Sequence, residues 1–77
     1  GSPKEEIVKL HDESAELHRR SVEVADEILK MHERSKDVDD ERESRELSKE
    51  IERLIREVEE VSKRIKRLSE EVEYLVR

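Results

Sequence analysis

Nine apolar residues, spaced alternately four and three positions apart, run through the second half of the sequence. They are Leu47, Ile51, Leu54, Val58, Val61, Ile65, Leu68, Val72 and Leu75. This is the a/d pattern of a heptad repeat, and it predicts an amphipathic helix that packs along one seam. We expect this helix to span about residues 38–77, with the carboxylate of Asp37 or Asp39 capping its first turn.

The first half of the sequence carries a helix start followed by a second heptad repeat. Ser2 can cap the first turn, Pro3 suits the first helical position, and Glu5 stands where a capping-box partner belongs. The a and d positions are Ile7, Leu10, Ser14, Leu17, Ser21, Val24, Ile28, Met31 and Ser35. Because neither glycine nor proline occurs after Pro3, we expect one helix over about residues 3–35.

A short turn at about residues 36–40 joins the two predicted helices, so they should pack antiparallel. The expected fold is therefore all-α, a two-helix hairpin that forms a single domain over residues 1–77. Composition alone suggests disorder, because 52% of the residues are charged and only 31% are hydrophobic. The two heptad repeats argue against disorder. So short a chain, without cysteine, still cannot bury a self-sufficient core.

The charge balance and the absence of long apolar runs argue against several functions. The net charge of −6 disfavours nucleic-acid binding, which needs a basic surface. No apolar run reaches the roughly 18 residues that span a bilayer, and no targeting signal indicates a cellular location. Pairs such as Glu60 and Arg64 indicate ordinary ion pairs along one solvated helix face. We expect Tyr74 at the rim of the open end of the hairpin.

The uncharged stripe of the first helix is wider than that of the second. In the second helix the b positions are charged, whereas in the first they are Val8, Ala15, Val22 and Leu29. Together with positions a, d and e, they cover roughly 160° of the first helix. One partner helix cannot cover so wide a stripe. We therefore expect other chains to cover it, with the first helix inside the assembly and the second outside.

All three histidines occupy position e, and each precedes a serine by three residues. In an antiparallel hairpin, residues at one level have position numbers with a constant sum. That sum is 80 for His11 with Ser69, His18 with Ser62, and His32 with Ser48. The polar layers predicted in this way are His11, Ser14 and Ser69; His18, Ser21 and Ser62; and His32, Ser35 and Ser48. Apolar layers hold Ala25, Ile28 and Ile55 between them, and Ile7 and Val76 at the open end.

Buried histidine and serine side chains can satisfy one another. A neutral imidazole has one donor and one acceptor nitrogen, and a serine hydroxyl serves as either partner. A complete network of this kind specifies the register and the number of chains. Protonation would turn the acceptor nitrogen into a second donor, and an imidazole removed from water resists protonation. We therefore interpret the nine residues of the polar layers as a pH-sensing network.

Other chemistry for the histidines has less support in the sequence. A solvated bystander is the usual role of a single histidine, but three in one register with matched serines are not typical of bystanders. Histidines one heptad apart lie about 10 Å from each other, too far to share a metal ion, whereas three symmetry-related histidines in one layer of a trimer could bind zinc. No acid shares their layers to orient an imidazole, and no glycine-rich turn could form an oxyanion hole. We expect no enzyme activity, no cofactor, no metal site and no small-molecule substrate.

These features resemble the de novo designed pH-responsive helical-hairpin oligomers. The resemblance extends over the whole chain and rests on the strict heptads, the Ser2-Pro3 start, and the histidines with their serines. It implies a C3 homotrimer of six helices in two concentric rings, which comes apart in mild acid. Some members of that family then bind and permeabilise lipid membranes. Two hypotheses follow: a homo-oligomer that dissociates with acid, or a static heterodimerisation module whose polar networks serve only pairing specificity.

Overall fold

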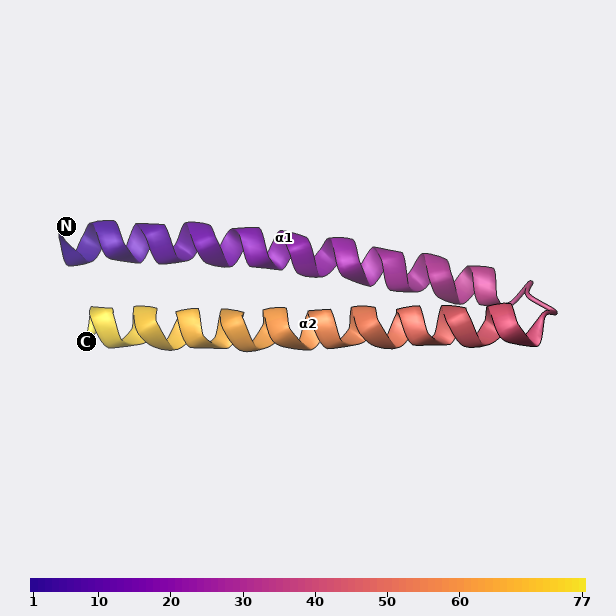
Figure 1. The fold of residues 1–77 in the computed structure, drawn as a ribbon. Helices are drawn as coiled ribbons and strands as arrows, with labels where there is room; N and C mark the ends of the chain where they lie inside the picture. Colours follow the sequence, from indigo (N-terminus) through magenta and orange to yellow (C-terminus); the bar gives the residue numbers. More distant parts are fainter.

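The computed structural model describes residues 1–77 as two α-helices and no strands. Helix α1 spans Pro3–Ser35 and α2 spans Glu41–Val76. They lie side by side and antiparallel, so that both termini meet at one end and the turn lies at the other (Figure 1). The all-α hairpin predicted from the heptads is therefore confirmed.

The hairpin is a rod of 58 × 15 × 14 Å. Its radius of gyration is 17.5 Å, well above the roughly 11 Å that a globular domain of this length would have. Since a helix rises about 1.5 Å per residue, two helices of 33 and 36 residues set this length directly. Most of the surface of each helix consequently faces away from its partner.

The start of α1 has the predicted cap. The hydroxyl of Ser2 accepts a hydrogen bond from the backbone N–H of Glu5 at 3.2 Å, and Pro3 is the first helical residue. Proline lacks an N–H that would have no partner at this position, and its fixed φ suits the helix. The side chain of Glu5 makes no reciprocal bond to the backbone of Ser2, so only half of the capping box forms.

The start of α2 differs from the expectation. The helix begins at Glu41 rather than near residue 38, and its N-cap is Asp40, whose carboxylate accepts from the Arg42 N–H at 2.9 Å. The predicted caps Asp37 and Asp39 were therefore wrong. The reason lies in the backbone: an N-cap needs an extended conformation, and Asp40 has it, with φ −76° and ψ 119°.

The turn reverses the chain without a left-handed residue. The backbone N–H groups of residues 36–38 each bond to a carbonyl three positions earlier, at 3.2–3.4 Å, which tightens the end of α1. No residue in the chain has a positive φ. These bonds extend the coil of α1 past Ser35, and they explain why Asp37 is not available as a cap for the next helix.

The core of the hairpin is a thin seam. Five residues are buried, and all of them occupy a or d positions: Leu10, Val24, Ile51, Leu54 and Leu68. The remaining a and d residues, including the three serines at position a, are half-buried. Neither helix contains a stretch that is both long and apolar enough to cross a membrane. A single chain thus buries very little of its apolar surface.

Candidate functional site

The seam between the helices has two edges, and one of them is closed by ion pairs between g positions. Arg20 Nη2 lies 2.5 Å from Glu57 Oε1, and Arg64 Nη2 lies 2.6 Å from Glu13 Oε1. The position numbers of each pair add to 77. Because g lies two residues after e and levels repeat every seven residues, this is the same register in which e positions add to 80. We call this edge the charged flank.

The ion pairs perturb the arginines in the direction expected for close contact. A hydrogen bond to the Glu57 carboxylate, and then its charge, raise the pKa of Arg20. The carboxylate of Glu13 raises the pKa of Arg64 in the same way. All four side chains keep contact with water. Their main effect is therefore to fix the register and to give this edge a hydrated, charged surface.

Sequence reasoning missed these pairs. The expected partner of Arg64 was Glu60 in its own helix, and this prediction was wrong: Arg64 crosses to Glu13, while Glu60 lies near Lys63 at 3.5 Å. The signal that could have found them was present. Glu13 and Arg64, like Arg20 and Glu57, are oppositely charged residues at g positions whose numbers add to 77.

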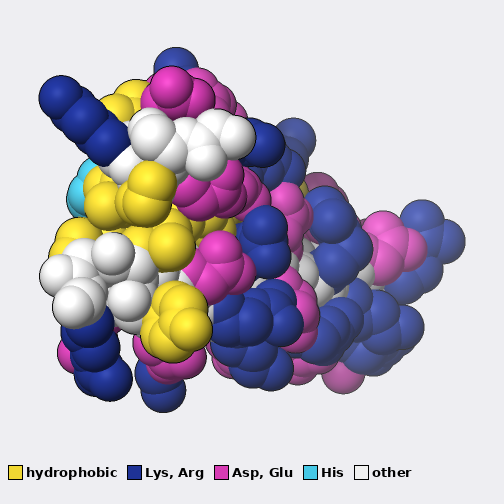
Figure 2. Space-filling model, turned by 90° about the vertical axis from the view of Figure 1, so that its left-hand side faces the viewer, with side chains coloured by type: hydrophobic (Ala, Val, Ile, Leu, Met, Phe, Trp, Pro, Cys, Tyr) yellow, Lys and Arg dark blue, Asp and Glu magenta, His cyan; other side chains and the backbone are white.

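The opposite edge, which we call the uncharged flank, is open. It consists of the e positions of both helices and the b positions of α1: His11, His18, Ala25, His32, Ser48, Ile55, Ser62, Ser69, Val76, Val8, Ala15, Val22 and Leu29. All of these residues are exposed. Seen from the end with the termini, hydrophobic side chains and a histidine gather on the left, while charged side chains spread over the right (Figure 2).

The uncharged flank holds nearly all the large apolar side chains that the hairpin leaves in water. Their exposed fractions are 53% for Val8, 69% for Val22, 65% for Leu29, 41% for Ile55 and 64% for Val76. Of the predicted apolar layers, Ile7 and Ile28 lie half-buried in the seam, whereas Ala25 is exposed on the flank. The apolar layers thus continue from the seam onto an uncovered surface.

The polar layers are brought to one edge, but they are not joined within one chain. Ser14, Ser21 and Ser35 are half-buried in the seam, and the histidines and the serines of α2 are exposed beside it. No hydrogen bond links a histidine of α1 to a serine of α2. His11, Ser14 and Ser69 do line one small cavity of about 70 Å³, together with Leu10, Leu68 and Val72. This is the layer that the register predicts.

The hydrogen bonds that the polar residues make are local. His18 Nδ1 lies 2.8 Å from the carbonyl oxygen of Ser14 and 3.4 Å from its hydroxyl. The in-chain partner of His18 is therefore the serine four residues before it, and not Ser21. The hydroxyl of Ser35 donates to the carbonyl oxygen of His32 at 2.7 Å. The rings of His11 and His32 make no hydrogen bond.

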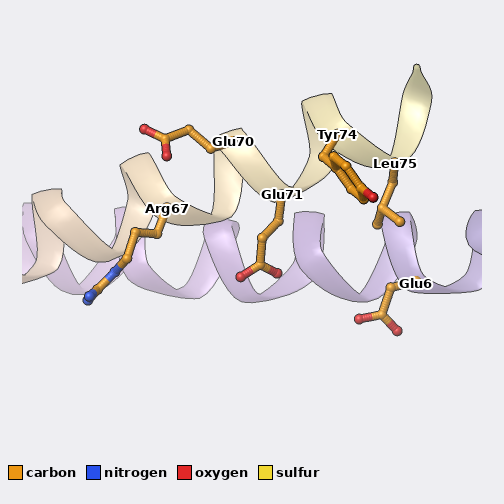
Figure 3. Close-up of a pocket in the computed structure, with 6 residues that line it drawn as sticks. All are labelled: Glu6, Arg67, Glu70, Glu71, Tyr74 and Leu75. Carbon is orange, nitrogen blue, oxygen red and sulfur yellow. The ribbon is translucent and has the colours of Figure 1, made fainter.

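A separate hollow of about 480 Å³ lies on the charged flank near the open end. Glu6 reaches it from α1, and Arg67, Glu71, Tyr74 and a few neighbours reach it from α2 (Figure 3). Glu6 and Glu71 stand at g positions in the register of the ion pairs, but both are negative, so no ion pair closes this end. Tyr74 is 76% exposed at the rim, as expected.

No group of three or more His, Asp or Glu side chains is arranged to hold a metal ion. The sequence matches no protein-family model, and no curated protein or solved structure matches it either.

Proposed function

We propose that this chain assembles with copies of itself through the uncharged flank, and that mild acid disperses the assembly. The observation that carries the proposal is the flank itself: five large apolar side chains are 41–69% exposed along one uncharged edge. Soluble monomers seldom expose such a continuous strip, and a strip of this kind marks a protein interface. The opposite edge, closed by ion pairs, is the part of the seam that stays in water.

A second copy suits this surface because the flank is self-complementary. It carries apolar side chains together with hydrogen-bond donors and acceptors and no formal charge at neutral pH, so two such flanks can cover each other without burying an ion. The width of the α1 stripe favours α1 as the inner helix of each copy. The resemblance described above favours three copies, which would make a six-helix homotrimer.

The acid response follows from the three histidines on the flank. Covering an imidazole with a neighbouring copy removes it from water, and this disfavours its charged form. Below about pH 6.5, the reference pKa of imidazole, the unassembled chain would bind more protons than the assembly, so the assembly should lose stability as the pH falls. The charged residues at the heptad positions next to the histidines are of two groups. The b positions of α2 hold Arg45, Glu52, Glu59, Lys66 and Glu73, and the f positions of α1 include Asp12 and Asp26.

The test is the mass of the particle, by native mass spectrometry or light scattering, from pH 7.5 to pH 4. We expect one defined oligomer at neutral pH and a steep loss of mass in mild acid. The matched control replaces His11, His18 and His32 with asparagine, and at a concentration where this variant is oligomeric at pH 7.5 its mass should change little over the same range. A neutral-pH monomer that assembles only with a different hairpin would instead support the static heterodimerisation module.

Released chains would then meet lipid membranes with an amphipathic surface. Val8, Val22 and Leu29 would lie beside the apolar seam, and such a surface can enter the headgroup region of a bilayer. Dye leakage from liposomes is expected to rise sharply below the pH at which the oligomer dissociates. Leakage that is equal at neutral and acidic pH would refute this part of the proposal.

A further inference from the structure

One histidine differs from the other two in its hydrogen bonding. His18 Nδ1 lies 2.8 Å from the carbonyl oxygen of Ser14, one helical turn earlier. A carbonyl oxygen only accepts hydrogen bonds, so Nδ1 must carry the proton. In a neutral imidazole the other nitrogen, Nε2, then has a free lone pair. The local helix geometry thus sets the tautomer of His18, while the rings of His11 and His32 have no such constraint.

The free nitrogen of His18 needs a donor once the flank is covered. His18 is exposed in the hairpin, and Nε2 has no partner within the chain. Leaving an acceptor unpaired at a buried interface is costly. The backbone N–H groups along both helices are already used in the helices. The remaining uncharged donors on the flank, apart from the other imidazoles, are the hydroxyls of α2: Ser48, Ser62 and Ser69.

We propose that His18 contacts a second copy of the chain through an unprotonated Nε2, which accepts a hydrogen bond from a serine hydroxyl of that copy. The inference rests on the proposed self-assembly. It adds which atom accepts and which group donates the hydrogen bond in one contact between copies. The occupant is a second copy because the flank that presents the acceptor also presents the donors. In this arrangement His18 is a specificity-determining residue, since a partner surface without a donor at this point leaves the acceptor unsatisfied.

Ser14 gives this contact a further consequence. It belongs to the level of His11, with which it lines the same small cavity, yet its carbonyl oxygen accepts the hydrogen bond of His18 Nδ1–H, from the next heptad. The levels of His11 and His18 therefore share a residue. The level of His32 is separated from them by the apolar residues Ala25, Ile28 and Ile55. The first two levels should respond together to a change in either.

The direct test is long-range ¹⁵N–¹H NMR of the histidine rings in the assembled protein at pH 7.5. We expect the spectrum of His18 to show a protonated Nδ1 and an unprotonated Nε2. A His18 protonated at Nε2 in the intact oligomer would overturn the inference and leave the proposed function standing. A monomer at pH 7.5 would overturn both, because no second copy would then be present to donate the hydrogen bond.

A matched pair of variants separates the two ring nitrogens. His18→Asn keeps an amide N–H near the place of Nδ1 but has no group near Nε2, whereas His18→Gln places an amide oxygen there. We expect the association constant to fall about tenfold or more for His18→Asn and clearly less for His18→Gln. Circular dichroism checks that both remain helical. Equal association of His18→Asn and the parent chain would refute the contact.

Discussion

Replacing Leu29 with glutamate is expected to disperse the proposed oligomer without opening the hairpin. Leu29 lies at a b position of the uncharged flank, and 65% of it is exposed in a single chain. It therefore contributes little to the seam between α1 and α2. The matched control is Lys9→Gln, which changes the net charge by the same amount at an exposed position that makes no ion pair.

The expected size of the effect follows from the exposed fraction. Burying a leucine side chain completely contributes about 1.5–3 kcal/mol, so covering the remaining 65% of Leu29 would contribute about 1–2 kcal/mol per copy. Glutamate loses this contribution and adds a buried, unpaired carboxylate, which costs several kcal/mol more. The association constant should consequently fall by a factor of at least about 100 for each interface formed.

Sedimentation equilibrium at pH 7.5 measures this effect, and circular dichroism reports on the helices in the same samples. We expect Leu29→Glu to sediment as a single chain at concentrations where the parent chain and Lys9→Gln are oligomeric. An oligomer of unchanged mass and affinity in Leu29→Glu would refute the assignment of the uncharged flank as the interface. Dissociation of Lys9→Gln to the same extent would point to net charge instead.

Three further predictions concern the hairpin itself. Asp40→Ala should lower the free energy of unfolding by about 0.5–2 kcal/mol, while Asp39→Ala should leave it nearly unchanged, because only Asp40 caps α2; urea unfolding measures both. Leu54→Ala should cost about 2–5 kcal/mol in the same assay, since Leu54 is 1% exposed. A hydrogen bond from Arg53 lowers the pKa of Glu50 from its ordinary 4.5, so its contribution to stability is present above that value and lost as the pH falls through the lower folded-state pKa. Urea unfolding from pH 6 to pH 3 should accordingly show a smaller acid-induced loss in Glu50→Gln than in the parent chain.

The heptad repeat was sufficient to predict the helices and the buried seam. The five buried residues all stand at predicted a or d positions, because the side-chain period of a helix decides which residues can face a partner. The N-cap of α2 could not be predicted in this way. Asp37, Asp39 and Asp40 offer the same carboxylate, and the choice depends on where backbone bonds at the end of α1 stop.

The cross-helix ion pairs show a second limit of sequence reasoning. Arg64 has a carboxylate within reach in its own helix, at Glu60, and another in the opposite helix, at Glu13. Spacing along one helix favours the first, and only the register between the helices identifies the second. That register was available from the histidines and serines. Applying it to position g as well as position e would have predicted both interhelical pairs.

In the proposed assembly, the two flanks decide which edge of the hairpin faces a neighbouring copy. Arg20 and Arg64 satisfy their charges on one edge and keep that edge hydrated, so a neighbouring copy gains nothing by covering it. On the other edge, the rings of His11 and His32 have no partner, and His18 uses only one of its two nitrogens. A single hairpin therefore presents incomplete polar layers next to uncovered valine and leucine side chains. Docking of a second uncharged flank would both complete the polar layers and cover these apolar side chains. Protonation of the imidazoles would break the polar layers again, but it would not change the apolar side chains. This is why acid should release chains that are still amphipathic, rather than chains that are simply charged.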